Sequence, residues 1–153
     1  MDKHRNEYIK QRVAPCGLHC GKCFAFAGGD IHRLSRELKN SLGNFDIYAQ
    51  RFVELLEEPV FAKYPDFKAF LDHLSTASCQ GCRKEKCKLF KTCRVRSCSK
   101  KQQVEFCFQC KHFPCNDTGF DEHLYQRFIT LNKRIQEIGM EKYYEEIKDL
   151  PRY

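Results

Sequence analysis

The sequence predicts a mainly α-helical protein with irregular zinc-knuckle loops, whose helices pack around cysteine-ligated metal sites. A small α+β fold is the variant. Three observations predict this: apolar residues recur at helical spacing, eleven cysteines fall in two blocks, and strand-like runs are scarce. Only VAP before Cys16 and QVEFCF around Cys107 have the character of strands. The 153 residues suffice for a single domain, 1–153, with a modest core.

The segment 24–78 separates the two cysteine blocks, and its apolar spacing and helix-end signals predict three helices. The first is capped by Asp30 and ends at Gly43, the second is capped by Asn44 and stops before Pro59, and the third begins near Pro65. Their apolar stripes are Ile31, Leu34, Leu38 and Leu42; then Phe45, Tyr48, Phe52, Val53 and Leu56; then Phe67, Phe70, Leu71 and Leu74. We expect these stripes to form core and not to bind a cofactor.

The C-terminal segment 116–153 predicts two more helices. One apolar face recurs over about four turns. Its residues are Leu124, Phe128, Leu131, Ile135 and Ile138. Gly139 suits the end of that helix, and MEKYYEEIKDL forms a last helix before Pro151. We expect the long helix to pack on the earlier ones, although a dimer seam fits the pattern too.

The first cysteine block, 16–23, reads CGLHCGKC and brings Cys16, Cys20 and Cys23 close together. A metal ion there needs a fourth ligand, such as His19, a cysteine of the second block, or water. The spacing is also that of the iron–sulfur loop of radical enzymes. Lys22 occupies the place of the usual aromatic residue, however, and the alternating strands and helices that such enzymes need do not follow.

The second cysteine block, 79–115, predicts metal binding more strongly. It contains Cys79, Cys82, Cys87, Cys93, Cys98, Cys107, Cys110 and Cys115. Two C-x2-C pairs, CQGC and CFQC, each place two sulfurs where one tetrahedral ion reaches both, and Gly81 allows the positive φ of such a turn. Eight thiols could fill two four-cysteine zinc sites or share ligands with the first block. Neither pair opens a helix after a strand, as thioredoxin-type chemistry requires.

The cysteines favour metal over disulfides. Eleven is an odd number, the polar N-terminus has no secretory h-region, and no run approaches the roughly 18 apolar residues of a membrane span. We therefore expect a cytoplasmic protein, in which thiols stay reduced. The expected cofactor is zinc, two to three ions, with an iron–sulfur cluster as the alternative.

The charge pattern bears on partners. The net charge is +7, and the stretch 83–101 holds nine basic residues against Glu85. This favours a protein or nucleic-acid partner and no membrane. The basic residues could equally offset thiolates, because three zinc ions on eleven thiolates would lower the net charge to about +2. Only Phe90 lies in the stretch as a stacking residue.

The chain carries no HExxH, P-loop, GxSxG or GxGxxG motif, so whether it is an enzyme stays open. His19 and His112 are the only histidines inside cysteine clusters. The sequence predicts a zinc-binding protein whose metals are mostly structural, acting as a binding module. Two alternatives are an iron–sulfur protein for electron transfer or sensing, and a small metalloenzyme that uses a metal on Cys16, Cys20 and Cys23.

Several blocks in order carry a resemblance to a known family. They are CGLHCGKCFAF, CQGCR, CRVRSC, EFCFQCKHFPC and IGMEKYYEEIKDLPRY. From Cys16 to Tyr153 the chain resembles an uncharacterised prokaryotic family, domain of unknown function 3795, whose short, cysteine-rich members are presumed to bind zinc. The resemblance carries over to every cysteine of the chain except Cys87. It implies metal binding and brings no activity.

Overall fold

The computed structural model describes residues 2–153 and is mainly helical, as predicted. The α-helices are α1 (Lys3–Arg12), α2 (Asp30–Leu42), α3 (Phe45–Leu55), α4 (Tyr64–Leu74), α5 (Val95–Gln102), α6 (Glu122–Ile138) and α7 (Met140–Ile147). Short 3₁₀ turns lie at η1 (Cys20–Lys22), η2 (Pro59–Lys63) and η3 (Cys107–Gln109). Within this described part, no helix combines the length and apolar character that crossing a membrane takes.

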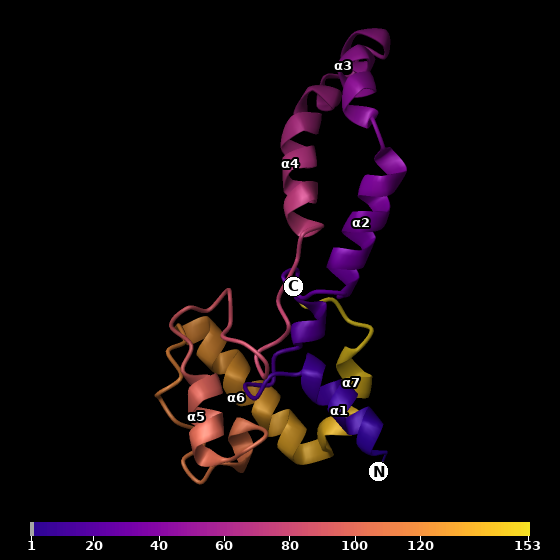
Figure 1. Ribbon diagram of the computed structural model, residues 1–153. Coiled ribbons are helices and arrows are strands. Elements are labelled where there is room, and N and C mark those ends of the chain that lie inside the picture. The colour runs from indigo at the N-terminus through magenta and orange to yellow at the C-terminus, as the bar shows by residue number, and fades with distance from the viewer. Residues whose placement is uncertain (1) are drawn as a thin grey trace.

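Helices α2, α3 and α4 form an arm, residues 30–74, that projects from the rest of the molecule (Figure 1). The predicted boundaries hold closely: α2 ends at Gly43 with φ of 52°, and α3 begins after Asn44. The N-cap of α2 is Gly29 and not Asp30, because the Asp30 side chain pairs with Lys22 instead of capping the helix.

The apolar stripes of the arm were expected to be core, and this was wrong for most of them. In α2 and α4 the buried residues are Ser35, Tyr64 and Leu71. The large apolar side chains beside them are exposed: Leu34 by 53%, Leu38 by 44%, Phe67 by 44% and Phe70 by 64%. Two helices side by side bury only the stripes that face each other, so a second apolar stripe on each helix has nothing to pack on.

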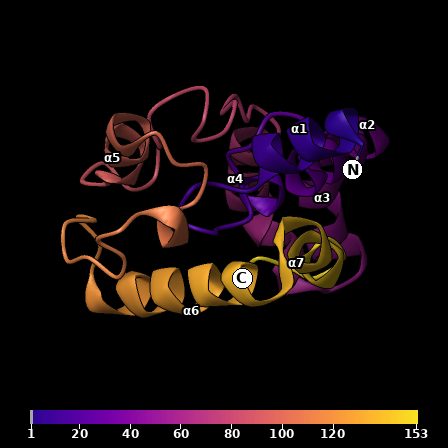
Figure 2. The ribbon, with the colours of Figure 1, turned by 90° about the horizontal axis from the view of Figure 1, so that it is seen from below.

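The other helices form the body, residues 2–29 and 75–153, in which α1, α5, α6 and α7 surround the cysteine loops (Figure 2). The predicted long helix is confirmed as α6, and Leu124, Phe128 and Ile135 are buried. One core cluster joins the first cysteine loop to Phe128 of α6. A second joins α1 to α6 and α7 through Ile9, Ile135 and Tyr143.

Strand pairing in residues 2–153 is limited to two isolated bridges, Val13 with His19 and Phe26 with Cys79. The predicted strand QVEFCF does not form. Instead the Gln109 side chain accepts hydrogen bonds from the backbone N–H groups of Glu105 and Phe106, and this local cap opens η3. Helices α1 and α5 had no apolar stripe to predict them: α1 buries only Ile9, and α5 lies inside the cysteine-rich segment.

Candidate metal centre

Seven thiols from both cysteine blocks line a single cavity of about 30 Å³ in the body. They are Cys16, Cys20, Cys23, Cys79, Cys82, Cys87 and Cys93. The remaining wall is mainly apolar, with Phe26, Leu89 and Phe120 among its side chains. The first block and the first half of the second block therefore meet, and all eleven cysteines of the chain are free thiols.

Tight turns hold the first cysteine block at this cavity. Gly17 has φ of +89°, and a Cβ there would lie 2.8 Å from the Cβ of Leu131, so the loop presses directly on α6. The buried Tyr143 hydroxyl of α7 donates a hydrogen bond to the carbonyl of Gly17 at 2.7 Å. The loop is thus positioned by two helices that are distant in sequence.

The second block reaches the cavity through backbone pairing with the segment after Cys23. The Cys79 N–H donates to Ala25 at 2.8 Å, and its carbonyl accepts from Ala27 at 2.9 Å. Gly81 follows with φ of +92°, as the CQGC spacing predicted, and turns the chain so that Cys82 faces Cys20. The C-x2-C turn therefore has the expected backbone form.

The Sγ atoms of Cys20 and Cys82 lie 3.7 Å apart. Two sulfurs on one tetrahedral zinc, each at about 2.3 Å from the metal, are separated by about 3.8 Å. The Cys82 thiol also contacts that of Cys87. Hydrogen bonding to Cys82 lowers the pKa of Cys20 to about 6 and that of Cys87 to about 5, while the pKa of Cys82 itself is raised.

Burial acts in the opposite direction on other thiols of the cavity. Desolvation raises the pKa of Cys16 to about 12 and raises the pKa values of Cys79 and Cys93. A buried thiolate needs a cation beside it, and a metal ion supplies the largest one. The donor set, soft sulfur ligands in an apolar wall, fits zinc or iron.

Two arginines bring positive charge to this site, and the sequence pattern gave no signal for either role. Arg152 lines the cavity and donates to the His19 carbonyl at 2.9 Å. Arg83 donates through Nε to the carbonyls of Lys10 and Val13, and its Nη2 is buried without a hydrogen-bond partner in the described chain. Arg83 does not line the cavity itself; its guanidinium carbon lies 4.9 Å from the centroid of the Phe106 ring.

The other four cysteines, Cys98, Cys107, Cys110 and Cys115, do not line this cavity. They influence one another electrostatically. Burial raises the pKa of Cys98, and Cys115 and Cys110 raise it further. Burial also raises the pKa of Cys107, to which Cys16 of the first block adds, followed by Cys115, Cys98 and Cys110. The CFQC loop that carries two of them is anchored by the buried Asn132, whose Oδ1 accepts from the Phe108 N–H at 3.0 Å.

In residues 2–153, no three side chains of the His, Cys, Asp or Glu type already stand at positions from which all could bind one ion. Ligation therefore requires side-chain adjustment within each thiol group. His19 is buried but does not line the thiol cavity, because its ring packs edge-on against Tyr144 at 5.5 Å; His112 is exposed. The Tyr153 hydroxyl lies 3.7 Å from the Cys23 sulfur, a contact that sequence spacing could not reveal.

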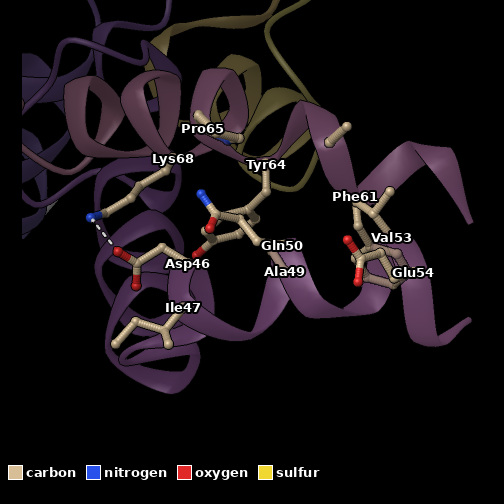
Figure 3. Close-up of a pocket in the computed structure, with 11 residues that line it drawn as sticks. Asp46, Ile47, Ala49, Gln50, Val53, Glu54, Phe61, Tyr64, Pro65 and Lys68 are labelled. Carbon is tan, nitrogen blue, oxygen red and sulfur yellow. Dashed lines mark ion pairs between the residues drawn. The ribbon is translucent and has the colours of Figure 1, made fainter.

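A larger cavity, about 720 Å³, lies at the far end of the arm and not at the thiols (Figure 3). Its walls come from α3, η2 and α4, and Asp46 pairs with Lys68 across it at 3.6 Å. It contains no cysteine or histidine, so it offers no metal-ligating group beyond carboxylates. The thiol cavity is the better candidate for chemistry.

Comparison with known proteins gives one match. The family model described as "Protein of unknown function (DUF3795)" matches residues 12–119, which include all eleven cysteines but not the C-terminal block IGMEKYYEEIKDLPRY. The description names no metal. No curated protein and no solved structure matches the chain significantly. The match covers well over half of the chain, which therefore belongs to this family of unknown function.

Proposed function

We propose that this protein binds zinc through its thiols, that the ions are structural, and that the body they hold together presents a binding module. One observation carries the proposal: seven of the eleven cysteines line one cavity, and the other four lie outside its lining. Four thiols match a closed tetrahedral zinc site, which has no open position for catalysis.

The seven-thiol group is too large for one ion. Two tetrahedral ions have eight ligand positions, so seven thiolates complete both if one sulfur bridges the pair. Cys82 is the candidate for the bridge, because its thiol contacts those of both Cys20 and Cys87. The protein would then hold three zinc ions, two of them in a shared site.

The charge of such a site supports the assignment. Two zinc ions with seven thiolates carry about −3 overall. Arg152 and Lys88 line the cavity, although Lys88 is exposed and also pairs with Glu85 at 3.8 Å, and Arg83 has the unpartnered buried nitrogen already described. These cations offset part of the thiolate excess.

The number of thiols at the cavity favours zinc over an iron–sulfur cluster. Seven sulfurs with one bridge complete two tetrahedral zinc ions, whereas one cluster is held by four cysteines and would leave three thiols of the cavity unused.

The proposed partner of the module is a macromolecule. In the stretch 83–101, Arg83 and Arg96 donate to backbone carbonyls of the body, at Lys10 and Lys84 among others, while the remaining basic side chains are exposed. Those exposed cations suit an acidic protein or a nucleic acid. Phe90 is half-buried against Phe120, so the stretch offers no free stacking platform.

The test is metal content per chain on protein purified anaerobically without chelator, with a visible spectrum. We expect three zinc ions and no visible absorbance. The Cys98→Ser variant should lose one ion and keep two, while the adjacent Ser97→Ala control keeps all three. Iron with acid-labile sulfide, or no bound metal, would overturn the proposal. A content of two zinc ions per chain would contradict only the pair of ions that share a bridging thiolate.

Replacement of zinc with ¹¹³Cd gives a sharper readout of the bridge. Three resonances are expected, and two of them should show mutual coupling through a shared thiolate. Three uncoupled resonances would mean that no sulfur bridges two ions.

A further inference from the structure

We infer that the arm pairs with the arm of a second copy of this chain through one apolar face of its α2–α4 helix pair. This goes beyond the zinc sites and does not depend on them. The face is made of Ile31, Leu34 and Leu38 of α2 with Phe67, Phe70 and Leu74 of α4. It accounts for the exposed stripes that a monomer leaves uncovered.

The contacts between α2 and α4 show that these six residues share a face. The two antiparallel helices meet along His32, Ser35 and Lys39 on α2 and along Leu71, Asp72 and Ser75 at the end of α4. His32 Nε2 lies 3.1 Å from the Ser75 carbonyl oxygen, and Lys39 pairs with Asp72 at 2.8 Å. On both helices, the residues that contact the other helix recur at helical spacing.

On each helix, the exposed apolar residues come one position before the residues that contact the other helix: Leu34 precedes Ser35, and Phe70 precedes Leu71. One residue back is a rotation of about 100° around a helix. Because the helices are antiparallel, the two rotations bring both stripes to the same side of the pair (Figure 1 shows α2 and α4 side by side). One residue forward, the opposite side carries Arg33, Arg36 and Asn40 of α2 and is polar.

The area of this face matches what a stable dimer needs. The four most exposed side chains, at 44–64%, each leave about 100 Å² of apolar surface in solvent, so a pair of copies would bury about 800 Å² from them. About two-thirds of a homodimer interface is apolar, which implies about 1,200 Å² in total. Specific interfaces begin at about this size.

The chemistry of the face indicates a second copy as the occupant. None of its six residues is charged. In a two-fold interface each group meets the same patch on its partner, so any net charge on the patch would repel itself. Two helix pairs joined by apolar faces form a four-helix bundle, and the projection of the arm keeps this surface clear of the body (Figure 1).

The experiment is the molar mass of the full, metal-loaded chain by light scattering over a range of concentrations. The chain has a mass of 18.1 kDa, and we expect a concentration-dependent rise toward about 36 kDa for a two-fold pair. Phe70→Glu and Leu34→Glu should each weaken the dimer by at least tenfold. A wild-type chain that stays monomeric at millimolar concentration would overturn the inference.

The matched control is Leu55→Glu, the same kind of substitution at a side chain that is 65% exposed on α3 and outside the face. It should leave the dimer intact, and helical content should be equal in all variants. If Leu55→Glu weakens the dimer as much as Phe70→Glu, a different surface is used. Hydrogen exchange should slow in α2 and α4 as concentration rises; protection confined to other helices would contradict the assignment.

Discussion

The arm and the body are stabilised in different ways. The arm is almost entirely helix, yet among its residues only Ser35, Ala49, Tyr64 and Leu71 are buried. The body has long irregular segments, but it contains both core clusters and every cysteine. Regular secondary structure and a buried core are therefore separated in this protein. The body gains order from its two core clusters and tight turns, whereas the arm depends on packing between its own helices, such as the contacts of Phe45 with Tyr64 and of Phe52 with Phe61.

In our proposals each region depends on a binding partner: the body on metal ions and the arm on a second copy of the chain. In the proposed function the body needs metal, because burial raises the pKa of several of its thiols, Cys16 and Cys107 among them, and disfavours their thiolate form. The arm needs a surface to cover its apolar face. Four predictions test this contrast, beginning with the largest expected effect.

Removal of zinc should unfold the body more than the arm. Structural zinc in small domains contributes about 10–16 kcal/mol per site, which is as large as the whole stability of a typical domain. After chelation we expect fast hydrogen exchange in 79–115 and a smaller change in α2 and α4, measured segment by segment with mass spectrometry. Unchanged protection in 79–115 would show that metal does not hold this segment.

Substitution Cys82→Ser should lower the free energy of unfolding by at least about 3 kcal/mol, because it removes a central ligand of the seven-thiol group. Its thiol contacts Cys20 and Cys87. Urea unfolding and metal content are the measurements, with and without added zinc. A variant with native metal content and stability would contradict a structural role for this site.

Two glycines offer a matched comparison of body and arm. Gly119 has φ of +75°, and a Cβ there would lie 2.0 Å from the Thr92 carbonyl oxygen. Gly43 has φ of +52° with open space around it. Gly119→Ala should therefore cost more than about 3 kcal/mol, from clash and strain together, and Gly43→Ala about 1–3 kcal/mol, from strain alone.

Thermal or urea unfolding of both alanine variants measures this difference. Equal losses at the two positions would mean that the chain crossing between Thr92 and Gly119 relaxes freely, and that the irregular segments of the body are less tightly packed than their contacts indicate.

Tyr143→Phe should cost about 1–2 kcal/mol, the smallest of the four effects. The change leaves the buried Gly17 carbonyl without the hydroxyl that donates to it at 2.7 Å. Urea unfolding measures the loss, and Tyr144→Phe on the same helix is the control, because no hydrogen bond from its hydroxyl to the first cysteine loop is present in residues 2–153. A larger loss in the control would place the stabilising contact elsewhere.

Much of the helical structure was predictable, because apolar spacing and end signals are local. Gly43 and Gly139 end their helices as expected, and the stripe through Phe128 and Ile135 is core. The role of the arm stripes was not predictable. An apolar stripe predicts that one face of a helix becomes buried, but it does not predict which other segment buries it. Leu34 and Phe70 belong to stripes with the same helical spacing as the stripe of Phe128. Only α6, however, lies within the body, where other segments cover its apolar face.

The candidate site shows the same limit. The cysteine spacing predicted C-x2-C turns, and the positive φ of Gly81 confirms that detail. That Cys16, Cys20 and Cys23 share a cavity with four cysteines of the second block depends on the pairing of Cys79 with Ala25 and Ala27, which are more than fifty residues away in sequence. Arg152 and Tyr153 reach the thiols from the far end of the chain, and no local pattern marks them.

The sequence by itself determined most of the helices, the family and the supply of soft ligands, because these follow from composition and from spacing along one element, whereas α1 and α5 carried no such spacing. The tertiary structure decided the division of the thiols into seven and four, the inward use of Arg83, and the exposure of the arm. The physical reason is that burial and charge depend on which segments meet, and the meeting of distant segments is settled only when the whole chain packs.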